Sequence, residues 1–459
     1  YRTTDYGKTW TSLATKDLQG YALSIEQDPV DPDLLFLGTE FGLWTSLDAG
    51  KSWMKWKHGF PTVSVQGLVV HPRDHDLVIG THGRAAYILD DVAPLRSVSK
   101  ETLAEPLHFF AVPDAQAYTT RQKEGARFVG DGEFRGENEP YGALLTYSLN
   151  FPGLPHPIDD KERERKQKER EAAVKALVTE TGEPVVDIPK EPEASAAAKP
   201  AEPPAPADDK APEVDIEVAD ATGAVIRKFK GPAKLGVNRT SWELRRDAFK
   251  RVQVPGEEPS EFRPRTGPEI LPGTYTVTIK FRGKEAKQSV RVVADPRETV
   301  PAEARQAKFD AVMRAGKMTE TITTAIERIQ KTRADIDAVS AKLKKPDDAT
   351  DKTPDPLVKS GAALKKRLDE MEKRLWLPPK TKGIVADKDV LSKIQYPMQA
   401  MQSSWDAPTP AQLGYLARAE ALLRTVLADY NKLFAEDVAK YREEVRAKNV
   451  MLVAEDPPL

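Results

Sequence analysis

Short apolar runs separated by turn-forming residues fill the first 95 positions of the chain, and they recur at a fixed spacing. The apolar run at 34–37 returns at 77–79, and Pro29 returns as Pro72, 43 positions later. Runs of this length bounded by turn signals are typical of β-strands. A repeat of about 40 to 45 residues built from such strands predicts the four-stranded blades of a β-propeller.

A polar octet recurs with the same period. Residues 3–10 and 46–53 share the pattern Ser/Thr-x-Asp-x-Gly-x-Thr/Ser-Trp. The aspartate can accept backbone N–H bonds across a turn, the glycine permits a positive φ, and the tryptophan can pack between sheets. The pattern resembles the Asp-box, or bacterial neuraminidase repeat, of sialidases and sortilin-type propellers. The resemblance implies a structural role, away from a central pocket, for Asp5, Gly7, Trp10, Asp48, Gly50 and Trp53.

The segment 80–95 also resembles the end of the propeller in bacterial proteins called sortilin-like or glycosyl-hydrolase-like. Within it, His82 and Arg84 stand beside two glycines at a strand end. These side chains could line a central channel and bind a ligand. Alternatively, the glycines serve a turn and the polar side chains meet solvent. We therefore treat His82 and Arg84 as candidate ligand-binding residues.

The blades are expected to occupy residues 1–98. Two to three blades are fewer than the roughly four that a closed ring requires. The chain also begins with Tyr1, within a blade. We expect the other blades to precede Tyr1 or to come from another chain.

Residues 104–296 predict a second β domain of about seven short, mostly alternating strands, as in an immunoglobulin-like sandwich. The part from Ile216 to Tyr275 resembles the immunoglobulin-like module of flagellar hook-capping proteins, which implies core positions for Trp242 and Tyr275. An insert at 156–213, first charged and then rich in proline, is predicted to be a disordered loop.

From residue 300 to 449 the pattern becomes helical. Ile322, Ile329 and Ile336 recur every seven residues and predict a long helix with a heptad seam. Thr409, followed by Pro410 and Gln412, predicts the start of another helix. We expect an antiparallel bundle of three or four helices. The seam could instead bind a helix of a partner protein.

Composition narrows the function. The 69 Lys and Arg residues nearly balance 71 Asp and Glu residues, so the charge gives no reason to expect a nucleic-acid partner. The chain has no cysteine, and its six histidines show no recognisable metal-ligand spacing. No apolar run is long enough for a transmembrane helix. We expect no cofactor and no metal.

Two functions of different class remain open. The first is a non-catalytic sortilin-like protein, secreted, periplasmic or at the cell surface, which binds a peptide or a glycan and uses the other domains as scaffold. The second is a sialidase-like glycoside hydrolase whose catalytic blades lie upstream of Tyr1. Such a site needs clustered arginines and a carboxylic acid. Residues 1–98 hold only Arg2, Arg73, Arg84 and Arg96.

Overall fold

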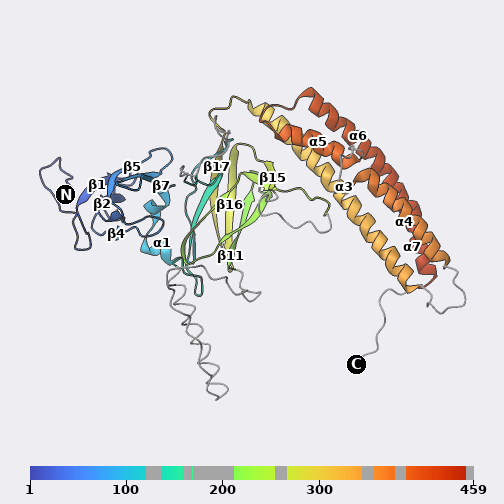
Figure 1. The fold of residues 1–459 in the computed structure, drawn as a ribbon, viewed down its shortest axis with the longest axis horizontal. Helices are drawn as coiled ribbons and strands as arrows, with labels where there is room; N and C mark the ends of the chain where they lie inside the picture. Colours follow the sequence, from blue (N-terminus) through green and yellow to red (C-terminus); the bar gives the residue numbers. More distant parts are fainter. Residues whose placement is uncertain are drawn as a thin grey trace, which may run out of the picture. The chain divides into compact units, whose positions relative to one another are not determined.

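The computed structural model describes residues 1–119, 136–158, 211–253, 266–343, 355–377 and 389–450, together with positions 161 and 168. The protein combines several β-sheets with a C-terminal helical region (Figure 1). Its internal contacts define two units. Unit 1 comprises Tyr1–Leu244 and Pro272–Ala294, and unit 2 comprises Arg245–Leu271 and Asp295–Leu459. Most of the expected insert at 156–213 lies outside the described residues.

Two antiparallel sheets begin unit 1 and correspond to the 43-residue repeat. Each sheet has its strands in sequence order, and each first strand carries a bulge at the same repeat position, between Ala22 and Ser24 or between Val65 and Gly67. The first sheet contains β1 (Ala22–Gln27), β2 (Leu35–Thr39), β3 (Gly42–Ser46) and β4 (Met54–Lys55). The second contains β5 (Val65–Val70), β6 (Leu77–Thr81) and β7 (Ala86–Leu89).

The two sheets stack through a shared apolar core. Phe36 and Leu43 of the first sheet pack with Leu68 and Ile79 of the second. Because side chains alternate across a strand, the opposite face of the first sheet has a separate cluster. That cluster includes Leu37, Trp44 and Trp53 with the partly buried Leu13.

After η1 (Ala93–Ser97) and α1 (Lys100–Ala104), unit 1 continues with two further sheets. Trp242 and Tyr275, the expected core positions, are buried and make an edge-to-face contact with centroids 5.3 Å apart. One sheet has the order β13 (Gly236–Trp242), β10 (Ala143–Leu149), β8 (Leu107–Phe109). The other has the order β12 (Val225–Pro232), β11 (Glu213–Ala219), β16 (Gly273–Phe281), β17 (Lys284–Val293), β9 (Ala115–Gln116).

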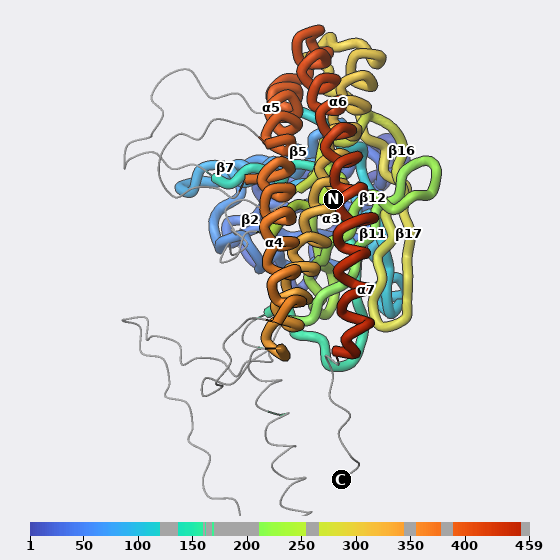
Figure 2. Tube along the Cα trace, turned by 90° about the vertical axis from the view of Figure 1, so that its right-hand side faces the viewer, coloured from blue at the N-terminus to red at the C-terminus, as the bar shows by residue number. Residues whose placement is uncertain are grey.

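The helices of unit 2 pack around one apolar core, and Figure 2 shows α4, α6 and α7 running beside α3. The heptad residues Ile322, Ile329 and Ile336 are buried in it, as the seam predicts. Thr409 and Gln412 form a reciprocal capping box, as expected. The helices are α3 (Ala302–Lys342), α4 (Pro356–Leu375), α5 (Val390–Gln402), α6 (Pro410–Leu433) and α7 (Ala439–Ala447).

A single π-helical turn, Phe434–Val438, joins α6 to α7. It coincides with the residue that falls out of step with the apolar pattern of the last helix. A π-turn adds a residue to one turn of helix and so shifts the phase of the apolar face. Tyr430 before the turn and Tyr441 after it are therefore both buried in the core.

The short strands β14 (Arg245–Asp247) and β15 (Thr266–Glu269) belong to unit 2, although the expected β domain spans 104–296 without a break. Phe249 lies against Gly316 of α3, and the Lys250 N–H donates to Glu320 Oε1 at 3.2 Å. Trp405 Nε1 donates to Glu269 Oε2 at 3.0 Å. The segment leaves the sheets because its apolar and polar contacts are with the helices.

Candidate functional site

The strand directions separate two ends of the stacked sheets. β3 begins at Gly42 and ends at Ser46, where the octet 46–53 starts. The β2–β3 loop at 40–41 therefore lies at the opposite end of the strands from that octet. β1 and β5 run in the same direction, because Ser24 contacts Val65 and Glu26 contacts Val70. The β6–β7 loop at 82–85 thus lies at the same end as the β2–β3 loop.

We call this end the loop edge and define it by Tyr21, Glu40, Phe41, His82 and Arg84. Tyr21 and Glu40 are joined by backbone and side-chain bonds, since each N–H donates to an oxygen of the other residue at 3.3 Å. The Phe41 ring lies against Gly20, where a Cβ would be 2.8 Å from Phe41 Cδ2. Tyr21 and Phe41 nevertheless keep large exposed surfaces. The loop edge thus presents aromatic faces beside charged groups.

His82 and Arg84 are held in a tight loop whose backbone is well satisfied. The His82 N–H donates to Ser64 O at 2.9 Å, and the Thr81 hydroxyl donates to Ala85 O at 2.6 Å. Gly83 has a φ of +89°, a conformation that glycine adopts without strain. Both candidate side chains are exposed, and within the described residues neither makes a hydrogen bond or an ion pair. The glycine therefore serves the turn, while the two side chains are available to a ligand.

The arginines of residues 1–98 do not come together. Arg73 lies on the turn before β6 and Arg84 on the loop after it, so the five-residue strand separates them by about 16 Å. Arg96 is committed to the buried Asp28, with its Nε 3.0 Å from Oδ1 and its Nη2 2.9 Å from Oδ2. These positions lack the arginine cluster that a sialidase-like carboxylate site needs.

Tyr21, Glu40 and Phe41 were not among the residues singled out by sequence. Their position could have been found from the repeat, because Thr39 and Thr81 end equivalent strands and each is bonded across the loop that follows. The loop at 40–41 is therefore the counterpart of the loop that carries His82 and Arg84.

The two octets have the same internal geometry, as their shared pattern predicts. In the first, Thr9 N–H donates to Asp5 Oδ1 at 2.9 Å and Gly7 N–H donates to Thr3 Oγ1 at 2.8 Å. In the second, the corresponding bonds from Ser52 to Asp48 and from Gly50 to Ser46 measure 2.9 and 2.8 Å. The residues before the two glycines, Tyr6 and Ala49, have φ values of 58° and 60°.

These bonds also explain the acidity of the two aspartates. The Thr9 backbone N–H, followed by the Thr9 hydroxyl, lowers the pKa of Asp5 to about 2. For Asp48, burial alone would raise the pKa, but the hydrogen bonds from Ser52 and Ser46 outweigh it and the pKa is lowered. Both carboxylates thus act as fixed acceptors within a turn, which is a structural role.

The octets differ in how their tryptophans are covered. Trp53 is 6% exposed, and its Nε1 donates to Leu13 O at 2.9 Å. Trp10 is 60% exposed, and its Nε1 bonds within its own octet to Gly7 O at 3.1 Å. The Leu13 side chain also lies where a Cβ on Gly50 would be. Burial of the octet tryptophan therefore depends on the neighbouring segment.

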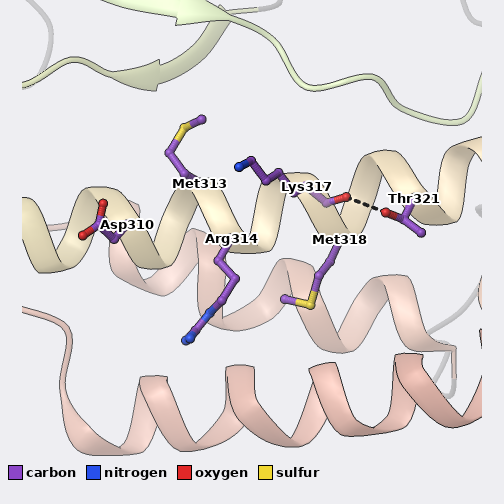
Figure 3. A pocket seen from close by; sticks show the side chains of 6 residues that line it. All are labelled: Asp310, Met313, Arg314, Lys317, Met318 and Thr321. Atoms are coloured by element: carbon purple, nitrogen blue, oxygen red, sulfur yellow. Dashed lines mark hydrogen bonds between the residues drawn. The ribbon is translucent and has the colours of Figure 1, made fainter. Parts of the chain in front are cut away.

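Unit 2 contains a second concave region along α3. A groove of about 540 Å³ lies between α3 and α6, with Arg328, Leu427 and Tyr430 in its lining. A smaller one of about 370 Å³ continues it toward the start of α3. Figure 3 shows Arg314 and Met318 pointing to the neighbouring helices and Met313 pointing away from them. The mixed charges and open form of the groove define no particular ligand.

Metal and membrane features add nothing to these regions. Within the described ranges, no group of three or more His, Asp or Glu side chains is placed to hold a metal ion. Among the helices that the structure describes, none combines the length and the apolar character needed to cross a bilayer. The loop edge is therefore our candidate functional site.

The chain matches no protein-family model and no curated protein sequence.

Proposed function

We propose that this chain is part of a non-catalytic, sortilin-like β-propeller protein, secreted or in the cell envelope, and that its loop edge binds a peptide or a glycan. In this proposal the two stacked sheets are Asp-box blades. The sheets formed by β8–β13, β16 and β17 are an immunoglobulin-like sandwich, and the helices are an antiparallel bundle. The sandwich and the bundle serve as scaffold.

The observation that carries the proposal is the composition of the loop edge. Exposed aromatic rings at Tyr21 and Phe41 offer the flat apolar surface on which a sugar ring or an apolar side chain can stack. Glu40, His82 and Arg84 supply charged and polar groups that can orient it. Loops carried on a rigid sheet scaffold are a common place for binding residues.

The geometry favours binding over glycoside hydrolysis. The conserved geometry of the octets accounts for Asp5 and Asp48 as turn acceptors, and Arg96 is committed to Asp28. The residues that remain free at the loop edge can contact a ligand but include a single carboxylate, Glu40. Hydrolysis with two carboxyl groups would need a second one there.

Binding can be tested with the whole chain immobilised and probed with a heptapeptide phage library and with a panel of neutral and acidic oligosaccharides. We expect retention of at least one probe class, and Arg84→Ala or Phe41→Ala should weaken it at least tenfold. Arg73→Ala is the matched control, because Arg73 is exposed at the opposite end of β6 and should leave retention unchanged. Turnover of 4-nitrophenyl glycosides, or retention that is insensitive to both loop-edge variants, would overturn the proposal.

A further inference from the structure

The two stacked sheets leave two apolar surfaces open, one at each end of the stack. On the outer face of the second sheet, Val69 pairs with Val78 and Val78 pairs with Ile88, so the three side chains form a row across the strands. We call this the back row; all three residues are exposed. At the other end of the stack, Ala22 and Ile25 of β1 are also exposed, and we call them the front pair.

The repeat shows what normally covers each surface. Strand pairing makes Phe36 the counterpart of Val78, because Phe36 pairs with Glu26 as Val78 pairs with Val69. Phe36 is fully buried against the second sheet, whereas Val78 is 39% exposed. The back row is thus the position at which one sheet receives the next.

The front pair has the matching history. Ile25 is the counterpart of Leu68, since both lie 43 positions apart at the same place after the bulge. Leu68 is 7% exposed because the first sheet covers it, whereas Ile25 is 55% exposed. The front pair is therefore the position that one sheet inserts into the sheet before it.

Two glycines show how closely such sheets approach. A Cβ on Gly38 would lie 2.5 Å from Val65 Cγ1, so the first sheet needs glycine there to receive the second. Gly80 occupies the same place in the second sheet, opposite Gly67, yet a Cβ there would meet only the backbone of Gly67, at 3.8 and 3.9 Å. The second sheet thus has the same recess with no side chain in it. Ala22, the counterpart of Val65, is small enough to fill it.

We propose that the back row of one molecule packs against the front pair of a second copy of this chain, in the way the second sheet packs against the first. The chain carries both halves of this contact, and its own sheet-to-sheet interface is the template. Because the two surfaces differ, the contact is head-to-tail, and repeated contacts would form a ring or a filament. Exposed apolar rows of this kind commonly mark association surfaces.

The test is the mass in solution of residues 1–459 by light scattering over a range of concentrations. We expect mass above the 50.8 kDa of one chain, rising with concentration. Val78→Lys and Ile25→Lys should each give a monomer, because every contact then has one damaged half. Gly80→Val should do the same without adding charge. Val30→Lys is the matched control, because Val30 is exposed outside both surfaces and should leave assembly intact.

Mixing the two lysine variants provides a sharper test. Val78→Lys keeps its front pair and Ile25→Lys keeps its back row, so an equal mixture should form a complex of twice the mass of one chain, and no larger. All the changed residues are exposed, and unchanged near-UV circular dichroism would show that each variant is folded. A wild type that stays monomeric, assembly that survives Val78→Lys, or a mixture that stays monomeric would overturn the proposal. So would a longer form of the polypeptide that is monomeric because its own sheets cover both surfaces.

Discussion

Phe249 lies so close to Gly316 that a Cβ on the glycine would fall 2.0 Å from the Phe249 Cζ atom. The phenylalanine belongs to the segment that follows β14, and the glycine lies within α3. Glycine inside a helix normally costs up to about 1 kcal/mol relative to alanine. Here it allows the ring to seat directly on the helix backbone.

Gly316→Ala should therefore destabilise unit 2 despite the better helix propensity of alanine. We expect a loss of about 1–3 kcal/mol, because overpacking displaces the ring. Gly414→Ala is the control, since nothing lies within 4 Å of that Cβ in α6. It should gain up to about 1 kcal/mol. Denaturant unfolding measures both. In a Phe249→Ala background the Gly316→Ala penalty should disappear, and an unchanged penalty there would contradict the contact.

Arg96→Ala should be among the most destabilising single changes in unit 1. Its guanidinium makes two bonds to Asp28, whose side chain is fully buried. Removing one partner of a buried pair leaves an uncompensated charge and costs about 3–5 kcal/mol. Arg73→Ala removes an exposed pair with Asp74 and should cost less than about 1 kcal/mol. Equal losses of free energy of unfolding for the two variants would argue against this assignment.

The same pair predicts an acid sensitivity. Burial raises the pKa of Asp28, but the bonds from Arg96 and from the backbone of Asp31 and Val30 outweigh it, so the pKa lies below its ordinary value of 3.8. A depressed pKa contributes stability above pH 4 that is lost as the pH falls through the folded-state value. Thermal unfolding of Arg96→Ala should therefore lose this part of its acid dependence relative to the wild type.

Asp91→Asn should stabilise the protein at neutral pH. Burial raises the pKa of Asp91, and Oδ2 has no hydrogen-bond partner in the described part of the chain. The folded state thus binds this proton more tightly than the unfolded state, and the wild type loses stability as the pH rises above about 4. Asparagine tolerates the φ of 42° and can keep the bond from the Ala93 N–H.

The gain from Asp91→Asn should be about 1 kcal/mol at pH 7 and should vanish near pH 3, as measured by thermal unfolding. Asp91→Ala is the matched variant. It also removes the charge, but it loses the acceptor and places a Cβ without local bonding at positive φ, so it should be less stable than Asp91→Asn. A pH-independent gain would show that the charge is not the cause.

The two octets allow hydrogen bonding to be separated from packing. Asp48→Ala breaks the turn that positions the buried Trp53, and we expect a loss of roughly 2 kcal/mol. Asp5→Ala breaks the same bonds beside the exposed Trp10, and the melting temperature should change little. If the two variants lower the melting temperature equally, the turn itself, and not the packing of its tryptophan, determines stability.

Local patterns predicted the local structures well. The octet fixes its bonds within eight residues, and Thr409 and Gln412 form their capping box within one turn, so sequence alone specifies both. The heptad seam around Ile329 is equally local. The contact of Phe249 with Gly316 joins residues 67 positions apart, and no periodicity encodes it. The loop edge depends on which strand ends meet, so only His82 and Arg84 drew notice beforehand.

The assignment of Arg245–Leu271 to unit 2 has a consequence for synthesis on the ribosome. This segment leaves the ribosome before α3, its packing partner, has been made. Phe249 must wait, exposed to solvent, until Gly316 and the helices beyond it emerge. Because domains usually fold as they emerge, the sheets can close around the segment first and fix both of its ends. The nascent chain would then carry a pre-anchored clasp, ready to receive the first helix that follows.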